Sequence, residues 1–349
     1  MTLQTIADRV GVSRMTVSNA FSRPDQLSPA LRDRILAAAQ DLGYVGPDPT
    51  ARALAKGTTG AVGILLTDSL RYAFTDPVAG GFLGAIAEEL APTGLAITLL
   101  TSSASADLVP ARDVAIDGAL VYSCDPTSSA VSWLRRRGLP IVYVDQDPAD
   151  DVPTVNIADR DGARAAAQHL LDLGHRRIAI VMKGHHGQHG FVTDPDDIVE
   201  GHASRQRRLG WFDVLRPAGI KPVVLCHPFD QTDHVRRDAR TLLSRSERPT
   251  AVLCFSDATA VGVLLAADDL GLRVPHELSV VGFDDGPLAT RLTPALTTVR
   301  QDVEEKGRVA AAALTEAIRR SRTGGTGPVS HVRLPATLVI RDSTGPAPA

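Results

Sequence analysis

Residues 2–22 read TLQTIADRVGVSRMTVSNAFS, and this stretch predicts two short helices joined by a tight turn. Apolar residues recur at helical spacing in each half, so each helix has one face to bury. Gly11 can adopt the positive φ that ends a helix, and the Ser13 hydroxyl can cap the helix that follows. The apolar positions are Ile6, Ala7 and Val10 in the first half and Val17, Ala20 and Phe21 in the second.

The predicted second helix carries polar side chains on the face away from its apolar stripe. Arg and Asn have paired polar atoms that match base edges in the major groove of DNA, and hydroxyls suit phosphate oxygens. One interpretation is a helix-turn-helix with a recognition helix, and the other is an ordinary helical hairpin. The residues expected to face DNA in the first case are Ser13, Arg14, Met15, Thr16, Ser18 and Asn19.

Residues 2–22, together with LSPALRDRILAAAQDLGY (27–44) and ARALAKG (51–57), closely resemble the DNA-binding head of the LacI/GalR repressor family. The resemblance continues to about residue 340. It implies a helix-turn-helix domain over residues 1–45, in which Thr5 joins the DNA contacts named above.

The resemblance also implies a linker over residues 46–60 with a hinge helix at about 50–55. In that family the hinge helices of two copies pack side by side on DNA, and Leu54 would be the wedge inserted into a central base step. Such a helix is too short to be stable alone, and a plain flexible linker is the alternative. The Gly46-Pro47-Asp48-Pro49 segment carries one residue more than the usual connection of the family.

From residue 61 onward, short apolar runs rich in β-branched residues alternate with helical stretches. This pattern predicts two successive doubly wound α/β subdomains with parallel sheets covered on both faces. The resemblance implies the architecture of periplasmic binding proteins, in which the chain crosses more than once between the subdomains. The expected boundaries are 61–158 with 301–322 for the N-terminal subdomain, 159–300 with 323–341 for the C-terminal subdomain, one last strand around 330–340, and a disordered tail over 342–349.

Polar residues that follow predicted strands are candidates for an effector site, because ligands of open α/β sheets bind beyond the carboxyl ends of the strands. Carboxylates and guanidinium groups can make paired hydrogen bonds to a polar ligand. For each residue alone, a helix cap or a structural ion pair is the alternative, and Asp257 is expected to cap the helix that begins there. The positions that the resemblance assigns to the effector are Asp145, Arg207, Ser256, Asp284 and Gln301, with Ser256 standing where an amide is common.

Three aromatic residues could stack on a ligand ring, either a sugar or a nucleobase. Tyr72 and Phe74 lie in the loop after the first predicted strand, and Phe229 follows a later one. Packing in the core is the alternative for all three.

Composition separates a basic head from an acidic body. The 349 residues have a formal net charge of −3, but residues 1–56 hold seven Lys/Arg and five Asp/Glu, so the head is positive and the remainder negative. This distribution fits a DNA-binding head attached to a sensor.

Cys124, Cys226 and Cys254 lie in apolar runs without metal-ligand spacing, which indicates buried thiols in a reducing compartment. Without a signal peptide or a long apolar run, we expect a cytoplasmic protein.

The sequence contains no GxSxG, Walker, HExxH or GxGxxG motif, so we expect neither an enzyme nor a cofactor. Three histidines occur in KGHHGQHGF (183–191), and a zinc site there is the minor alternative to a variable loop. Their spacing matches no helical ligand pair, so we expect no metal.

The sequence therefore predicts a LacI-like transcriptional repressor. A homodimer would bind a pseudo-palindromic DNA operator, and a small effector of the sugar or nucleoside class would bind between the subdomains. Two alternatives stay open at this point. One is a sugar- or nucleoside-binding protein of the transport or sensing type without DNA function, and the other is a metabolic enzyme with an appended head.

Overall fold

The computed structural model describes residues 2–348 except 47, 67–69, 102–108, 125–127, 185–188, 199–200, 228–231 and 326, and omits the side chains of residues 49, 50, 55, 71 and 72. The chain forms two compact units, Met1–Gly60 and Ala61–Ala349, which we call the head and the body. No helix among the described residues is both long and apolar enough to cross a membrane.

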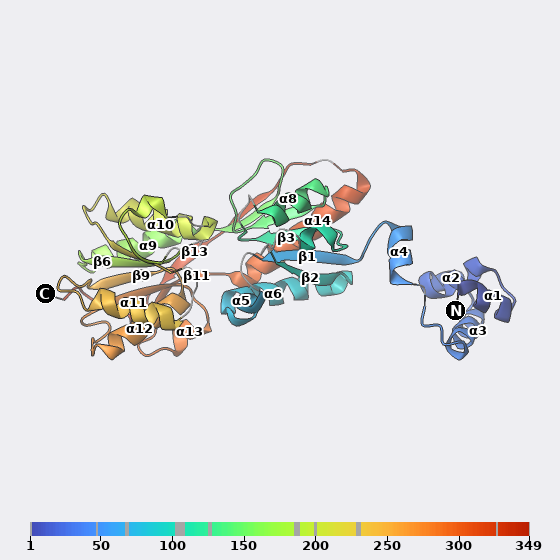
Figure 1. Cartoon of the computed structure of the whole chain (residues 1–349), viewed down its shortest axis with the longest axis horizontal. Coiled ribbons are helices and arrows are strands. Elements are labelled where there is room, and N and C mark those ends of the chain that lie inside the picture. The colour runs from blue at the N-terminus through green and yellow to red at the C-terminus, as the bar shows by residue number, and fades with distance from the viewer. Residues whose placement is uncertain are drawn as a thin grey trace. The chain divides into compact units, whose positions relative to one another are not determined.

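The head is a three-helix unit (Figure 1). The end of its first helix and the start of its second are capped as the sequence predicts. Ser13 caps the second helix by accepting a hydrogen bond from the Thr16 N–H at 3.0 Å, and Gly11 ends the first helix at φ 76°. Ile6, Val17 and Ile35 are fully buried where the three helices meet. The elements are α1 (Leu3–Val10), α2 (Arg14–Ser22), the 3-10 turn η1 (Pro24–Gln26) and α3 (Pro29–Asp41).

A fourth helix, α4 (Pro49–Lys56), lies where the hinge helix was expected. The Asp48 side chain accepts a hydrogen bond from the Ala51 N–H at 2.9 Å, and Gly57 ends the helix with a φ of 66°. The extra residue of the linker therefore still allows a capped helix, because Pro49 occupies a first-turn position that tolerates proline.

The body contains two sheets, each covered by helices on both faces. The first has the order β12-β5-β4-β3-β1-β2 with every neighbouring pair parallel, and the second has the order β13-β11-β10-β9-β6-β8-β7. The two edge strands of the second sheet, β7 and β13, are antiparallel to their neighbours, which differs from the purely parallel sheets predicted. The strands are β1 (Ala61–Leu66), β2 (Ala96–Thr101), β3 (Ala119–Tyr122), β4 (Ile141–Val144), β5 (Thr154–Ile157), β6 (Ile178–Lys183), β7 (Gly190–Val192), β8 (Val223–His227), β9 (Ala251–Cys254), β10 (Ser279–Asp284), β11 (Thr297–Gln301), β12 (His331–Leu334) and β13 (Ala336–Val339).

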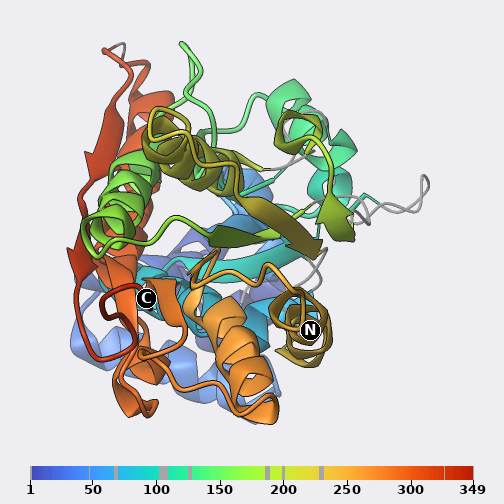
Figure 2. The same cartoon turned by 90° about the vertical axis from the view of Figure 1, so that its left-hand side faces the viewer.

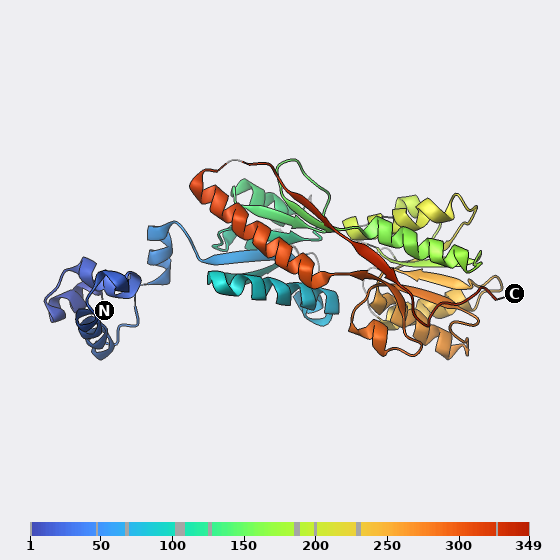
Figure 3. The ribbon, with the colours of Figure 1, turned by 180° about the vertical axis from the view of Figure 1, so that it is seen from behind.

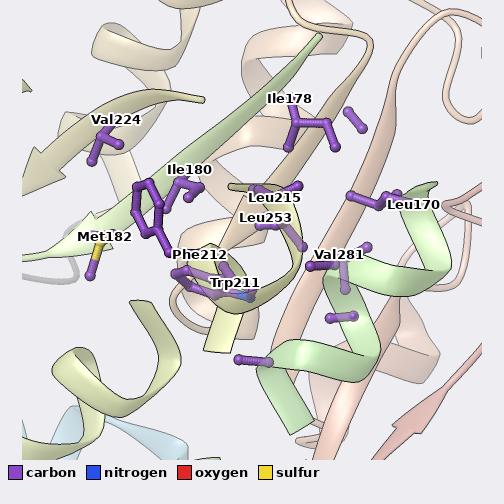
Figure 4. Packing of buried hydrophobic residues seen from close by; sticks show 14 of the residues in the cluster. Leu170, Ile178, Ile180, Met182, Trp211, Phe212, Leu215, Val224, Leu253 and Val281 are labelled. Carbon is purple, nitrogen blue, oxygen red and sulfur yellow. The ribbon is translucent and has the colours of Figure 1, made fainter. Parts of the chain in front are cut away.

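Buried apolar clusters fix the helices to these sheets. In the N-terminal subdomain, α6 and α14 contribute to one cluster and α7 and α8 to the other. In the C-terminal subdomain, α9 and α10 cover one face and α11 and α12 the other (Figures 1 and 2). Trp211 and Leu215 of α10 pack with Ile180 of the central strand β6 (Figure 4). The helices are α5 (Leu70–Thr75), α6 (Pro77–Leu90), α7 (Pro110–Asp113), α8 (Ser129–Arg136), α9 (Asp159–Asp172), α10 (His202–Leu215), α11 (Thr232–Leu243), α12 (Asp257–Asp269), α13 (Pro287–Arg291) and α14 (Val303–Thr323), with 3-10 turns η2 (Ala91–Thr93) and η3 (Pro195–Asp197).

The chain crosses between the two sheets three times: after β5, after β11 and between β12 and β13 (Figure 3). The prediction of one last strand over 330–340, with residues 323–341 in the C-terminal subdomain, was wrong. Residues 331–334 pair with β5 in the first sheet, and only residues 336–339 pair with β11 in the second.

The tail predicted to be disordered, residues 342–349, was also assigned wrongly, because its described part is held against the C-terminal subdomain. Ser343 is fully buried, where its Oγ accepts a hydrogen bond from the Thr297 N–H at 2.8 Å and donates to the Val280 carbonyl at 2.6 Å. The Ala347 N–H donates to the Leu173 carbonyl at 2.9 Å.

Candidate functional site

A cavity of about 100 Å³ lies in the body between the two sheets, beside the carboxyl ends of their strands. This is where open parallel sheets bind ligands. Both subdomains contribute to its wall, and charged, hydroxyl and aromatic side chains alternate there. The lining residues are Leu66, Ala73, Asp76, Val78, Ala79, Tyr122, Ser123, Asp145, Lys183, Ala203, Arg207, Phe255, Ser256, Asp284, Gln301 and Lys306.

The backbone is strained at this edge of the sheets. Ser123 and Asp145 have a φ of 52°, Asp284 has a φ of 118° and Asp285 a φ of 56°, in regions that non-glycine residues seldom occupy. All four lie at or just beyond the carboxyl ends of β3, β4 and β10. Strain of this kind, at roughly 1–3 kcal/mol per residue, persists where the surroundings over-determine the conformation, as in ligand sites. Here it turns the side chains of Asp145 and Asp284 toward buried cations.

Arg207 of α10 is the centre of the polar network on the C-terminal side. Its Nε donates to Asp159 Oδ1 at 2.8 Å, and one terminal nitrogen donates to the Phe255 carbonyl at 2.6 Å and lies 3.5 Å from Asp284 Oδ1. The guanidinium also lies 3.6 Å from the centroid of the Phe283 ring. A guanidinium is the cation suited to this place, because it can serve several acceptors while its flat face packs on a ring.

Lys306 of α14 is the corresponding cation on the N-terminal side. It is 1% exposed, and its Nζ donates to Asp145 Oδ2 at 2.7 Å and to Gln301 Oε1 at 3.1 Å. Gln301 then donates through Nε2 to Asp284 Oδ1 at 2.6 Å. Since Gln301 ends β11 of the second sheet and Lys306 and Asp145 belong to the first subdomain, this amide forms a polar bridge across the boundary between them.

Burial changes the proton affinity of these acids. Burial raises the pKa of Asp284 well above its ordinary value, although Arg207 acts in the opposite direction. The pKa of Asp159 is raised for the same reason. Among the described residues, no hydrogen-bond partner reaches Asp145 Oδ1, which is buried in the cavity wall. A hydroxyl of a bound molecule would satisfy that oxygen.

Five predicted effector residues, Asp145, Arg207, Ser256, Asp284 and Gln301, are brought together around this one cavity. Whether they bind an effector stays a prediction. Ser256, rather than Asp257, is the residue that caps α12, since its Oγ accepts a hydrogen bond from the Thr259 N–H at 3.0 Å. The expectation that Asp257 is the cap was therefore wrong.

The structure supports none of the three predicted aromatic contacts: one lies outside the cavity wall, and the side chains of the other two are not described. Phe74 is 72% exposed on α5 and is not part of the cavity wall, so the structure does not support a stacking role for it. The side chain of Tyr72 and all of Phe229 lie outside the described residues. Tyr122 and Phe255, which the sequence did not single out, are the aromatic rings of the wall.

Lys306, Lys183 and Asp76 were not predicted as residues of this site. Lys306 could have been found, because it lies four residues before Ala310 on the apolar stripe of a helix, where an unpaired lysine would be very unfavourable. Lys183 ends β6 at the position expected of a site residue. Asp76 caps α6 through the Val78 and Ala79 N–H groups.

The head presents its predicted DNA-facing residues on and around α2. Met15 is 69% exposed and Leu54 of α4 is 87% exposed, which is unusual for large apolar side chains. Arg14 is exposed, and Asn19 is held by donating from Nδ2 to Gln26 Oε1 at 3.2 Å. Ser13 and Thr16 share a 2.9 Å hydroxyl contact, Thr5 contacts the Thr2 hydroxyl at 3.1 Å, and the carbonyl of Ser18 accepts from the Ser22 hydroxyl.

Comparison with known families gives two matches. A family model described as "Bacterial regulatory proteins, lacI family" matches residues 2–46. A model described as "Periplasmic binding protein-like domain" matches residues 167–344.

The chain is similar over its length to characterised proteins. It is 38% identical over 318 residues to the HTH-type transcriptional regulator IpsA of Corynebacterium glutamicum, and the match covers 88% of each chain. The crystal structure of the lac repressor dimer bound to operator and the anti-inducer ONPF matches with a TM-score of 0.76 at 25% identity, covering 99% of both chains. A transcriptional regulator CelR–cellobiose complex matches with a TM-score of 0.67 at 28% identity, covering 98% of this chain and 99% of the other.

Proposed function

Since the chain belongs to the lacI family of bacterial regulatory proteins, we propose that it is a homodimeric repressor controlled by a sugar or nucleoside bound in the body. Membership of the family makes it a DNA-binding transcriptional regulator with an effector-binding body, and not an enzyme. A transport-type binding protein would have no use for the head. On this proposal the protein works in the cytoplasm, where its operator is.

The DNA contacts that we propose follow from exposure and chemistry in the head. Arg14, Met15 and Asn19 would read base edges from α2, and the hydroxyls of Thr5, Ser13, Thr16 and Ser18 would contact phosphates. Leu54 would be inserted into a central base step through the minor groove, which would account for the exposure of so large an apolar side chain. A homodimer would place two such heads on a pseudo-palindromic operator.

The observation that carries the effector proposal is the mixed polar wall of the cavity. Carboxylates of Asp145 and Asp284 accept hydrogen bonds from hydroxyls, while Arg207 and Lys183 donate to ring or hydroxyl oxygens. The Tyr122 and Phe255 rings can face the apolar side of a pyranose or a base. The CelR–cellobiose complex indicates that this fold accepts carbohydrate, which supports a sugar or nucleoside here.

The Gln301 bridge suggests how binding would reach the DNA. A ligand that competes for Asp145 or Asp284 must replace contacts that now join Lys306, Gln301 and Asp284 across the subdomain boundary. The equilibrium between two arrangements of the subdomains would then shift, and with it the spacing of the hinge helices that precede the body in each copy. Couplings of this kind typically amount to about 1–3 kcal/mol, or roughly 5–150-fold in operator affinity.

The test begins with ligand discovery on the full-length protein. A thermal-shift screen against sugars, nucleosides and sugar phosphates should show stabilisation by a member of the first two classes, because a ligand that binds only the folded state stabilises it by mass action. Asp284→Asn should lose the response, while Asp268→Asn, an exposed change on α12, should retain it. Stabilisation by sugar phosphates alone would contradict the proposed effector class.

A truncated body of residues 61–349 separates the two activities. It should bind the effector as the full chain does but lose all preference for operator DNA, because the head and the body are separate compact units. Retention of operator binding by the truncated body would contradict the assignment of the DNA contacts to the head.

A further inference from the structure

Two histidines and one carboxylate meet at the edge of the second sheet, and none of the three lines the cavity. His189 precedes β7, His227 ends β8, and Asp238 lies on α11. One potential ligand atom from each residue lies within 4.8 Å of the other two. From this geometry we propose that the three side chains form a binding site for a divalent transition-metal ion of the Zn²⁺ type.

The fold brings these residues together although they are far apart in sequence. Strand β7 is antiparallel to β8 with Gly190 opposite Cys226, so the next positions outward, His189 and His227, are cross-strand neighbours. Asp238 lies three residues after Val235 and one before Ala239, both buried, so its part of α11 faces the sheet. The β7–β8 pairing and α11 therefore bring the three side chains to one place.

The distances suit a tetrahedral ion after a small adjustment. With metal–ligand bonds near 2.0–2.1 Å, the ligand atoms of a tetrahedral zinc site lie about 3.3 Å apart. His227 Nδ1 lies 3.6 Å from Asp238 Oδ2, and His189 Nε2 lies 2.7 Å from the same oxygen. The second pair would open by roughly 0.6 Å, which is feasible because His189 is half exposed and precedes an edge strand.

The donor set also suits the ion chemically. Two neutral imidazoles and one carboxylate are borderline ligands that Zn²⁺ accepts, and the single negative charge partly neutralises the ion. The imidazole centroids are 5.7 Å apart, close to the roughly 5–6 Å expected for two rings bound to one ion. The alternative is a plain ion pair between His189 and Asp238, but that pair would need no second imidazole beside the same oxygen.

The site would have a structural role and leave its fourth position to water. A bound ion would fasten the β7–β8 hairpin to α11. His227 is paired in register with Lys183, a residue of the cavity wall, so this clamp lies one strand away from the candidate effector site.

The experiment measures Zn²⁺ binding to untagged full-length protein that has been stripped with a chelator. Titration calorimetry and metal analysis should give one tightly bound Zn²⁺ per chain, and the ion should raise the melting temperature. His189→Ala and Asp238→Asn should each weaken binding by at least about 100-fold and abolish the thermal shift. His234→Ala, which removes an exposed histidine from the same helix, should leave both unchanged.

Melting curves without metal show whether each variant is folded, since neither change removes a fully buried side chain. The proposal is overturned if the wild-type protein takes up no stoichiometric Zn²⁺. It is equally overturned if folded Asp238→Asn binds the ion as tightly as the wild type, because the ligands would then lie elsewhere.

Discussion

Replacing Asp257 by Asn should stabilise the C-terminal subdomain at neutral and alkaline pH. Asp257 is 4% exposed, and burial raises the pKa of its carboxyl from an ordinary value of 3.8 to about 7. The Thr298 hydroxyl donates to Oδ1 at 2.5 Å and the Gly286 N–H to Oδ2 at 2.9 Å, and these two hydrogen bonds and the charge of Arg207 offset only part of the effect of burial. When the carboxyl is protonated, its O–H donates to the Thr298 oxygen and its other oxygen still accepts from the Gly286 N–H. An Asn side chain can make the same two contacts through its NH2 group and its carbonyl oxygen.

The size of the effect follows from linkage. Because the carboxyl binds its proton more tightly in the folded than in the unfolded chain, stability is highest at low pH and falls as pH rises from about 4 to about 7. At about 1.4 kcal/mol per pKa unit, ionisation of Asp257 lowers the free energy of unfolding by about 4 kcal/mol once pH exceeds 7. About 2–3 kcal/mol of this is lost between pH 5 and pH 8. The amino end of α12 favours the anion and makes these figures upper bounds.

Urea unfolding followed by Trp211 fluorescence measures the change, in a Trp133→Phe background that leaves one tryptophan in the chain. The difference in unfolding free energy between Asp257→Asn and its parent should grow by about 2–3 kcal/mol from pH 5 to pH 8. Asp268→Asn, on the exposed side of the same helix, should show no such growth. If the difference between Asp257→Asn and its parent is the same at both pH values, Asp257 does not ionise between them with the raised pKa that burial gives it.

Further predictions concern DNA contacts and the polar bridge. Asn19→Ala should weaken the free energy of operator binding by about 1–3 kcal/mol through one or two base positions, which competition assays on single-base operator variants would identify. Equal weakening of binding to operator and to random DNA would count against a base contact by Asn19. Leu54→Ala should reduce operator bending in gel-mobility or energy-transfer assays, and unchanged bending would remove the wedge. Asp284→Ala should abolish the effect of the effector on operator affinity, so a normal response would exclude this residue. Lys306→Met should lower the free energy of unfolding by about 3–5 kcal/mol by leaving a buried carboxylate unpaired. Adding Asp145→Asn, which removes that charge and tolerates the positive φ of this position, should recover much of the loss; no recovery would contradict the pairing.

The repeating pattern of the body and the head was predictable because it depends on local signals. Gly11 and Ser13 mark the turn of the head through backbone conformation and capping, which neighbouring residues determine. Asp145 and Asp284 could each be placed at a ligand-binding edge because parallel strands bring their carboxyl ends to the same edge of their own sheet. Both inferences need only the order of strands and helices.

Features that depend on contacts between residues far apart in the sequence were not predicted. The division of the last strand at residue 335 depends on hydrogen bonds to β5 and β11, which lie in different sheets. The short strand β5 was not anticipated at all. The tail near Ser343 looks polar and mobile in sequence, yet buried hydroxyl and backbone partners at Val280 and Thr297 hold it. His227 and Asp238 showed no motif with His189 because three separate elements bring them together.

Occupation of the cavity in the body should change the affinity of the heads for operator DNA. The most direct test is the ratio of operator dissociation constants, measured by fluorescence anisotropy on full-length protein at one fixed salt concentration, with and without saturating effector. We expect the two dissociation constants to differ by roughly 5–150-fold in the wild-type protein and to be equal in Asp284→Ala. A ratio of one in the wild-type protein, with effector binding demonstrated in the same sample, would contradict it.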